Sequence, residues 1–327
     1  MTMNSPDINL ATKSNATGIL CALGATAFFS VNDVTIKFLS GDYALHQVVL
    51  IRSLIALGVI TILIVPLQGG FSVLRTRRIG MHLMRGCCVV LANMCFFVAL
   101  ASMPLAEAVA IFFVSPLLIT AFSVFFLGEL VGARRWAAVV FGLIGVIVML
   151  RPGSDAFKLI SLLPLISAAA YAGLHILTRK IGGTERAVTM AFYVQLSFIA
   201  VSGAMGLVFG DGAMEGGGNA SVEFLLRHWV WPAAADWPLL IALGLTNGFA
   251  ALLISQAYRL SEAALIAPFE YIAMPLAVFW GALVFGEWPD RVAWVGIALI
   301  VGSGLYVFVR EAVQNRRAVS ARPPSIR

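Results

Sequence analysis

The sequence predicts an all-α polytopic membrane protein with ten transmembrane helices arranged as two inverted five-helix repeats. Three observations lead to this prediction. First, 60% of the 327 residues are hydrophobic and only 12% are charged, about half the charged share of an average soluble domain. So few charges cannot cover the surface of a soluble protein of this size. Second, apolar runs close to the ~20 residues of a membrane-spanning helix recur along the chain. Third, several motifs recur at matching spacing in its two halves.

The apolar runs define the expected helices in chain order. Their length excludes a membrane β-barrel, whose strands alternate apolar and polar residues over about 10 positions. Most connections between runs are short, so neighbouring helices are expected to pack as antiparallel hairpins; the exception is the segment 210–238. The ten runs cover Ala16–Leu39, Ala44–Leu67, Leu83–Ala101, Leu105–Leu127, Trp136–Leu150, Leu159–Leu177, Ala187–Phe209, Leu239–Tyr258, Ala263–Phe285 and Val292–Val309.

Lys and Arg residues are distributed unevenly between the connections. With ten spans and a cytoplasmic N-terminus, segments on the cytoplasmic side hold 16 of the 22 Lys and Arg residues. This asymmetry follows the positive-inside rule and places both termini in the cytoplasm. The net charge of +6 is thereby assigned to the membrane flanks, so the lipid bilayer is an expected partner and nucleic acid is not. The run after Lys13 is too long for a signal-peptide core.

Motifs in the first half return in the second. Ser115-Pro116 is matched by Met274-Pro275, Gly128-Glu129 by Gly286-Glu287, and Trp136 by Trp294, all at almost the same offset along the chain. Because each half holds five spans, an odd number, the second half must enter the membrane upside down. Inverted repeats of this kind are typical of secondary transporters, whose substrate sites lie near the midplane between the halves.

The repeat boundaries divide the chain into four parts. A cytoplasmic N-terminal tail is expected over residues 1–15. The first five-helix repeat is expected over 16–150 and the second over 151–310. A basic cytoplasmic tail is expected over 311–327.

With these motifs in place, the chain resembles the drug/metabolite transporter superfamily, whose members carry two EamA-like repeats. The resemblance covers about residues 16–310. Two features depart from the pattern: span 1 carries Asn32-Asp33, and the second half lacks a clear counterpart of Arg52. The residues that carry the resemblance are Lys37, Arg52, Pro116, Gly128-Glu129, Trp136, Gly142, Gly145, Pro275, Gly286-Glu287, Trp294 and Gly302.

The resemblance implies a secondary transporter that moves a small organic metabolite by alternating access in a bacterial inner membrane, without a cofactor. Within the superfamily the chain is most similar to bacterial riboflavin transporters, so riboflavin uptake is the expected function. An S-adenosylmethionine carrier, or a carrier for uptake or efflux of another metabolite, is the alternative. A membrane scaffold without transport is the alternative of another class. The resemblance leaves a homodimer open.

Three charged residues near the start of the chain need an explanation, because a charge inside the bilayer costs a few kcal/mol. Asp33 and Lys37 lie four residues apart on one helix face, acid first, which favours an ion pair. This pair is either structural or a gate that repacks during transport. Arg52 is expected to join Asp33 in a network, and Lys37 can instead snorkel to the outer interface.

Glu270 is the fourth intramembrane charge singled out. It lies between Pro268 and Pro275, and proline kinks or breaks a helix. A broken helix near the midplane exposes backbone groups, which transporters use to build sites. Its counterpart in the first half is Ile111 or Phe112, so the carboxyl is not a copy of the repeat. We therefore expect Glu270 to face the substrate or to carry a coupling proton, against the alternative of a structurally paired acid.

Uncharged residues complete the expected site. Amide and phenol side chains within the spans can hydrogen-bond to a ligand or between helices, and aromatic rings near Glu270 can stack on a flat ligand. An intramembrane enzyme is not expected, because the four His residues are scattered and form no cluster with ligand or triad spacing. The uncharged candidates are Asn32, Tyr193, Gln195, Asn247 and Tyr271.

Overall fold

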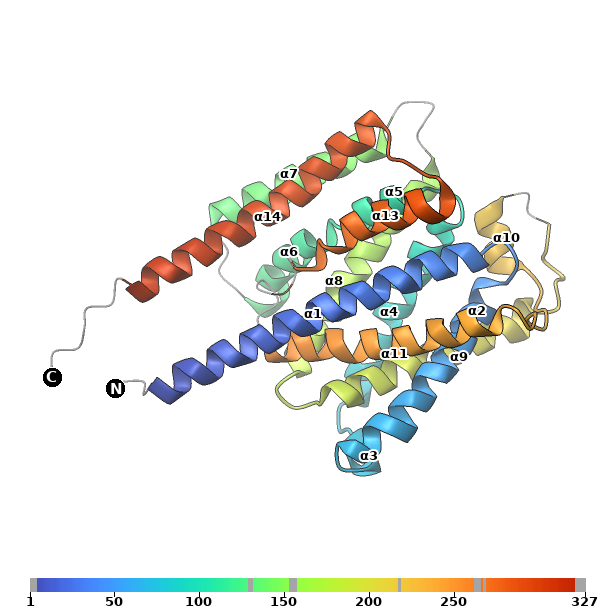
Figure 1. The fold of residues 1–327 in the computed structure, drawn as a ribbon, viewed down its shortest axis with the longest axis horizontal. Coiled ribbons are helices and arrows are strands. Elements are labelled where there is room, and N and C mark those ends of the chain that lie inside the picture. Colours follow the sequence, from blue (N-terminus) through green and yellow to red (C-terminus); the bar gives the residue numbers. More distant parts are fainter. Residues whose placement is uncertain are drawn as a thin grey trace.

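Every regular element in the described part of the chain is a helix. The computed structural model describes residues 5–128, 132–152, 158–216, 219–261, 266 and 269–320. The helices run roughly along one direction, and the first and last described residues, Ser5 and Ser320, lie at the same end of the bundle (Figure 1). We call this the termini end; the opposite end, which holds the connection 40–44, is called the far end. The predicted all-α polytopic fold is confirmed.

The first half of the chain forms a run of long helices and short turns. Its elements are α1 (Ser5–Leu39), α2 (Leu45–Val59), the π-helical turn η1 (Ile60–Ile64), α3 (Val65–Leu67), the 3-10 turn η2 (Phe71–Leu74), α4 (Ile79–Leu100), α5 (Leu105–Phe112), α6 (Ser115–Leu127) and α7 (Ala133–Leu150).

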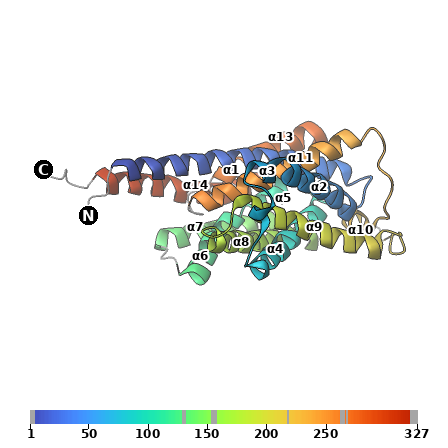
Figure 2. The same cartoon turned by 90° about the horizontal axis from the view of Figure 1, so that it is seen from below.

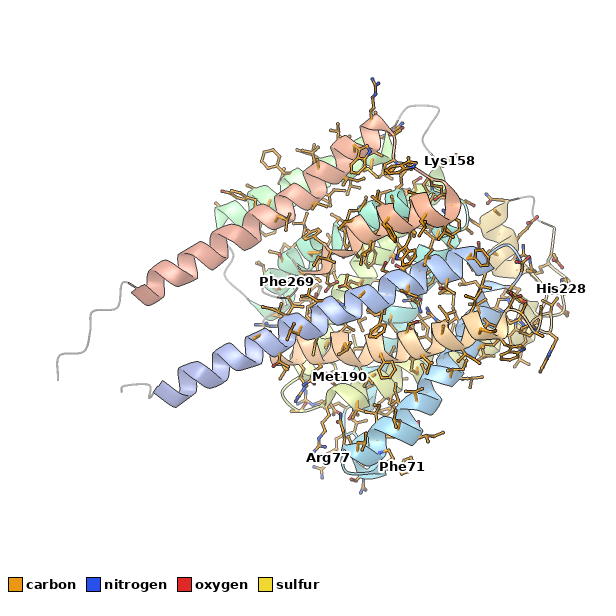
Figure 3. All side chains as sticks on the ribbon, in the orientation of Figure 1. Phe71, Arg77, Lys158, Met190, His228 and Phe269 are labelled. Atoms are coloured by element: carbon orange, nitrogen blue, oxygen red, sulfur yellow. The ribbon has the colours of Figure 1, made fainter. Side chains whose placement is uncertain are left out.

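The second half of the chain also forms long helices and short turns, and it includes the short helix α10, which lies in the long connection at the far end. Its elements are the 3-10 turn η3 (Leu159–Leu162), α8 (Leu163–Ile181), α9 (Ala187–Phe209), α10 (Ala220–Leu226), α11 (Trp237–Leu260), α13 (Ala273–Phe285) and α14 (Arg291–Ser320). In Figure 3, Lys158 and His228 mark the far end, whereas Arg77 lies away from them, at the lower edge.

Seven helical stretches among the described residues are long and apolar enough to cross a bilayer, and three shorter apolar helices accompany them. The shorter ones are Trp136–Leu150, Ala273–Phe285 and Arg291–Ser303. The 13 residues of α13 rise only about 20 Å, so a span at this position needs the residues before it. The count of ten spans therefore stays a prediction.

Two helices are interrupted at corresponding places. The first break, at Phe113–Val114, separates α5 from α6, and the second, at Tyr271–Ile272, precedes α13. Helices α6 and α13 begin at corresponding positions of the repeat, Ser115 and Ala273, and both end at a left-handed glycine, Gly128 (φ 68°) and Gly286 (φ 67°). Glycine adopts this conformation without the steric cost that a Cβ brings. The motif spacing in the sequence thus reappears in the helix boundaries.

The packing of the helices follows the same correspondence. Helix α1 packs along α11, and α8, its counterpart in the second half, packs along α4. Helix α2 packs on its counterpart α9, and α7 packs on α14. Figures 1 and 2 show α7 and α14 together at one edge, beside the helices that surround the centre.

Glycines allow the close approach of α7 and α14. A Cβ added to Gly145 would lie 3.1 Å from the Gly296 carbonyl oxygen, and one added to Gly296 would lie 3.1 Å from the Gly145 carbonyl oxygen. Small residues at such contacts let membrane helices pack backbone to backbone.

The terminal helices are longer than the predicted spans. Helix α1 begins at Ser5 rather than at Ala16, and α14 continues to Ser320 rather than ending near Val309. Part of each predicted tail is therefore helical. Residues such as Gln, Arg and Ala in 311–320 are good helix formers, so the helix continues where the apolar run that guided the prediction has ended.

Candidate functional site

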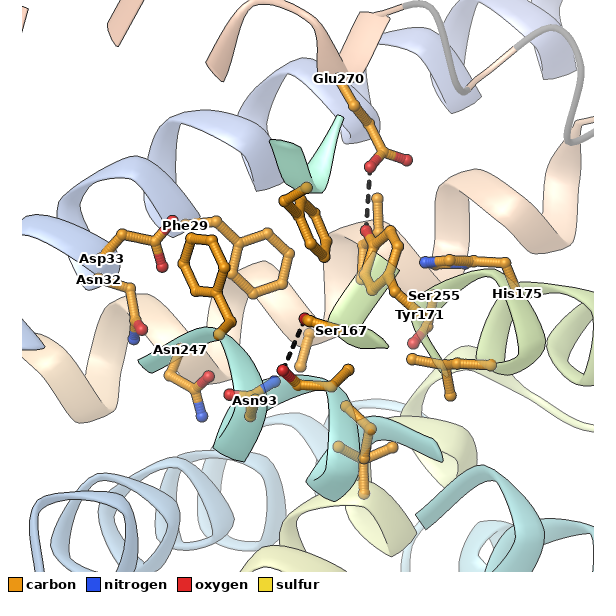
Figure 4. Close-up of a pocket in the computed structure, with 18 of the residues that line it drawn as sticks. Phe29, Asn32, Asp33, Asn93, Ser167, Tyr171, His175, Asn247, Ser255 and Glu270 are labelled. Carbon is orange, nitrogen blue, oxygen red and sulfur yellow. Dashed lines mark hydrogen bonds between the residues drawn. The ribbon is translucent and has the colours of Figure 1, made fainter. Parts of the chain in front are cut away.

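A cavity of about 150 Å³ lies at the centre of the bundle. Side chains from both halves line it, on α1, α2, α4, α5, α8, α9 and α11 and around the break before α13. Six of the nine predicted site residues belong to this lining, namely Asn32, Asp33, Arg52, Gln195, Asn247 and Glu270. In Figure 4, Asp33 and Asn32 lie on one side of the cavity and Glu270 on another, with Asn247 and Asn93 below and between them.

Arg52 is the largest of the fully buried side chains among the described residues, with 1% of its surface exposed. Its Nη1 donates to Asn32 Oδ1 at 2.8 Å and its Nη2 to Asn93 Oδ1 at 2.6 Å. The guanidinium also lies 5.3 Å from the centre of the Phe97 ring and 5.2 Å from that of Phe198. Amide oxygens and aromatic faces stabilise a cation without neutralising it. Arg52 thus links α1, α2, α4 and α9 while keeping its charge.

Asp33 lines the cavity beside this network. No hydrogen bond or ion pair of its carboxylate occurs within the part of the chain that the structure describes. The positive charge of Arg52 attracts this carboxylate, but the described hydrogen bonds of Arg52 go to Asn32 and Asn93, so the network of Arg52 with Asp33 stays a prediction. An acid in this position can accept a hydrogen bond or compensate a positive charge on a ligand.

Glu270 lies immediately before the break at Tyr271–Ile272 and is 7% exposed. Its Oε2 accepts a hydrogen bond from Tyr171 Oη at 3.0 Å, and its Oε1 accepts one from Tyr258 Oη. His175 lies between the two phenols, with ring centroids 4.2 Å from Tyr171 and 3.9 Å from Tyr258. Its two ring nitrogens have no hydrogen-bond partner among the described residues. Glu270 is thus held by two phenol donors, Tyr171 and Tyr258.

The two helix breaks meet near this carboxylate. The Phe113 and Tyr271 rings, one from each break, have centroids 5.3 Å apart. Phe112, one of the two residues that the motif spacing sets against Glu270, has its ring 5.0 Å from the Tyr171 ring. The acid in one half and the aromatic ring in the other therefore contact the same tyrosine.

Three predicted site residues lie outside the cavity lining. Tyr193 donates to the Leu74 carbonyl at 3.2 Å and stacks on His82 with centroids 4.5 Å apart. The buried Tyr271 hydroxyl has no hydrogen-bond partner among the described residues. Lys37 lies nearer the far end.

The i,i+4 spacing led us to expect an ion pair between Lys37 and Asp33. In the structure Lys37 pairs with Glu287 instead. Its Nζ lies 2.7 Å from both carboxylate oxygens of Glu287 and also donates to the Met103 carbonyl at 3.0 Å. Glu287 in turn accepts the Leu105 backbone N–H at 3.0 Å. The long lysine stem reaches past the cavity to the far end, where the chain after α13 supplies a carboxylate. We call Lys37, Glu287 and the Leu105 N–H the far-end latch.

Another ion pair lies outside the spans beside the latch. Arg151 Nη2 lies 2.5 Å from Asp290 Oδ1. This hydrogen bond holds the pKa of the Asp290 carboxyl below its ordinary value. The same carboxylate accepts the Ala293 N–H at 2.7 Å and caps the start of α14, as an N-terminal Asp commonly does.

The far-end latch should behave as a coupled pair. We expect Glu287→Gln and Lys37→Met each to lower the thermal stability of the purified protein, because each strands a half-buried partner. The double variant should lose less than the sum of the two, with a coupling free energy of about 1–3 kcal/mol. Unfolding of the four proteins in detergent measures this cycle. If the stability losses of the two single variants simply add in the double variant, Lys37 and Glu287 have no interaction energy, and the coupled pair is disproved.

The sequence analysis did not select several residues of the site. Tyr171 and Tyr258 hold Glu270, Asn93 holds Arg52, and Arg85 lines the cavity; Tyr258 itself is not part of the lining. One signal was available for Tyr171, which aligns with Phe29 when the first spans of the two halves are matched; both residues line the cavity. Arg85 was counted among the cytoplasmic charges, because it lies close to the start of its apolar run.

Comparisons with known proteins agree with this architecture. Residues 16–151 match the model of the EamA-like transporter family. The chain is 31% identical over 303 residues, 92% of its length and 95% of the relative, to a protein of Vibrio cholerae named riboflavin transporter. It is 26% identical over 306 residues, 93% of its length and 96% of the relative, to a protein of Rickettsia prowazekii named S-adenosylmethionine uptake transporter.

A solved crystal structure has the same fold. It aligns with a TM-score of 0.63 over 91% of this chain and 99% of the solved one, at 22% sequence identity. At this identity the likeness concerns the arrangement of the helices alone.

Proposed function

The chain belongs to the EamA-like transporter family, and from that premise we propose that it takes up riboflavin by alternating access. The relatives named above are transporters of small molecules, which points to transport rather than to enzymatic catalysis. The chain is a multi-pass membrane protein. What supports the choice of substrate is the chemistry of the central cavity.

The charge balance of the cavity is the observation that carries the proposal. Two acids, Asp33 and Glu270, and two cations, Arg52 and Arg85, belong to the described lining, so their formal charges cancel. A substrate that enters such a cavity needs to bring no counter-charge. Riboflavin carries no net charge at neutral pH.

The remaining lining suits a flat ring system with polar edges. Aromatic rings of Phe29, Phe96 and Phe112 face the cavity together with the amides of Asn93 and Asn247. Aromatic faces stack on planar ligands, and a few well-placed polar groups orient a ligand in an otherwise apolar pocket. The isoalloxazine ring offers both a stacking face and an edge of hydrogen-bonding groups.

A second candidate substrate, S-adenosylmethionine, is favoured by one observation. The Asp33 carboxylate has no hydrogen-bond or ion-pair partner in the described ranges and could compensate a sulfonium. The adenine ring would stack as the flavin does. The net positive charge of this substrate is less well matched to a cavity whose own charges cancel.

The two halves move against each other in this proposal. We propose residues 16–150 and 151–310 as the inverted repeats, supported by helix boundaries at corresponding positions in the two halves and by the paired packing of α1 with α11 and α8 with α4. A bacterial inner membrane with both termini cytoplasmic is proposed on the Lys and Arg distribution. The far-end latch would then close the periplasmic side.

Growth of a riboflavin auxotroph without an importer tests the function. Cells that express the protein should grow on micromolar riboflavin and accumulate labelled vitamin, whereas cells with the empty vector should not. A parallel assay with labelled S-adenosylmethionine separates the two candidates. If the protein is present in the membrane and neither compound enters, the riboflavin proposal fails and the scaffold alternative gains support.

A further inference from the structure

Arg85 is a buried cation that the proposed function uses only as part of the charge balance of the cavity, without assigning it a contact. It lies in the second turn of α4, near the termini end, and only 2% of its surface is exposed. Its side chain belongs to the cavity lining. A charged residue at this depth needs compensating partners, because burial without them is costly.

The partners that Arg85 has are neutral. Its Nε donates to Thr178 Oγ1 at 3.0 Å, and its Nη1 lies 3.5 Å from the Met190 carbonyl oxygen. No carboxylate lies within ion-pair distance of it in the part of the chain that the structure describes. Glu185, whose charge acts on Arg85 from farther away, is engaged with Thr76 at 2.7 Å and with His82 at 3.5 Å.

The guanidinium keeps free donors that are open to the cavity. Arginine has five N–H donors in a fixed fork, and the two contacts above use one at Nε and one at Nη1. Arg52 Nε is fully buried and has no hydrogen-bond partner among the described residues, and no nitrogen of Arg85 is in that situation. Arg52 has two amide acceptors and two aromatic rings around its guanidinium. The two arginines of the cavity therefore differ in how many of their N–H donors have an acceptor. Arg85 lacks a pair of acceptors.

We propose that Arg85 anchors the substrate by donating a forked pair of hydrogen bonds to two adjacent acceptors on the edge of the substrate. This inference rests on the proposed function and names the contact that selects the substrate. In riboflavin the acceptors are a ring carbonyl and the neighbouring ring nitrogen of the pyrimidinedione edge; in S-adenosylmethionine they are the two carboxylate oxygens. The shared chemistry is a planar acceptor pair, which the guanidinium fork matches better than an ammonium does.

The position of Arg85 also orients the substrate. Asn93, which holds Arg52, lies eight residues farther along α4, about 12 Å away along the helix axis. A ligand anchored at Arg85 would therefore extend from the termini end toward Arg52 and Asp33, with its rings among the phenylalanines of the lining.

Binding to the purified full-length protein in lipid nanodiscs tests the anchor. Quenching of flavin fluorescence should show that Arg85→Gln binds riboflavin about 10- to 100-fold more weakly than the wild type, as expected for the loss of a charge-assisted contact. Arg85→Lys should fall between the two. Arg259→Gln, at an exposed arginine near the same end, is the matched control and should bind as the wild type does. Unchanged riboflavin affinity in Arg85→Gln would overturn the anchor.

A change on the ligand identifies the contact directly. Sulfur is a poor acceptor, so the wild type should bind 2-thioriboflavin or 4-thioriboflavin more weakly than riboflavin. Arg85→Gln should bind riboflavin and both analogues alike, since the donor pair is gone. If Arg85→Gln loses as much affinity for the thio analogues as the wild type does, the flavin carbonyl does not contact Arg85, and the proposal is overturned. If Arg85→Gln does not fold, Arg85→Lys replaces it, and a smaller penalty than in the wild type is expected.

Binding of riboflavin by the wild type tests the proposed function, independently of the role of Arg85. A wild type that does not bind riboflavin disproves the riboflavin proposal, and the anchor is then tested by calorimetry with S-adenosylmethionine. Loss of that binding in Arg85→Gln would support the anchor for a carboxylate, and unchanged binding would overturn it. Binding of neither compound by the wild type would overturn both inferences.

Discussion

Glu270→Gln is expected to reduce riboflavin uptake at least about 10-fold while leaving the protein at its normal level in the membrane. Glutamine has the size of glutamate, and its amide oxygen can accept the hydrogen bond of Tyr171 or Tyr258. The fold around the break at Tyr271–Ile272 should therefore persist. The variant removes only the negative charge and one acceptor.

The charge at Glu270 matters because it is balanced within the cavity. With Asp33 it offsets Arg52 and Arg85, so its loss leaves one excess positive charge around an uncharged substrate. Interactions of this kind are strong where water is excluded. A carboxylate that carries a coupling proton would also be lost in the same variant, and uptake would then no longer respond to a proton gradient.

Uptake per molecule of membrane protein is the measurement that decides. Glu215→Gln is the matched control, because Glu215 is an exposed acid that pairs with His228 outside the spans. It should transport as the wild type does. If Glu270→Gln transports at the wild-type rate, Glu270 has no part in the site; if the amount of protein falls and the specific rate does not, its role is structural.

The sequence predicted the helices of this protein well because their signal is local. Each apolar run reports the residues of one helix, and most predicted runs coincide with described helices, with short gaps in some. In the run Ala263–Phe285, positions 263–265 and 267–268 lie outside the described residues, and the described helix α13 begins only at Ala273. The repeat of Gly128 at Gly286 is also visible in the sequence, and both positions end a helix. The site residues Asp33, Arg52 and Glu270 could be selected because a charge inside the bilayer must have a reason to be there.

Pairings between distant segments could not be predicted in the same way. The partner of Lys37 is Glu287, far along the chain in the second half, and hydrophobicity carries no information about which chain segment meets the end of α1. The nearer acid at position 33 gave a plausible pair at helical spacing, but the two side chains extend to different places. The helix break at Phe113–Val114 was missed because a proline at Pro116 is compatible with the start of a helix as well as with a kink.

Arg52→Gln is expected to have the second large effect, on stability as well as on uptake. The guanidinium joins Asn32 and Asn93 and lies between the Phe97 and Phe198 rings. A glutamine cannot span these partners. We expect the free energy of unfolding to fall by about 3 kcal/mol, as when one member of a buried charged network is removed, and uptake to be lost.

Asp33 makes this prediction specific to charge. Arg52 is the described cation whose charge acts on the Asp33 carboxylate. In the Arg52→Gln background this carboxylate loses that compensation, so the second substitution Asp33→Asn should recover part of the lost stability. The same substitution alone in the wild type should lower stability, since it leaves Arg52 without its acid. Opposite signs in the two backgrounds are the signature of a coupled pair. Thermal unfolding of the four purified proteins measures these signs, and Arg52→Lys, which keeps the charge without the fork, should retain more stability than Arg52→Gln. If Asp33→Asn lowers stability equally in both backgrounds, the two charges do not compensate each other, and the balance of charges in the cavity cannot be the reason that it accepts an uncharged substrate.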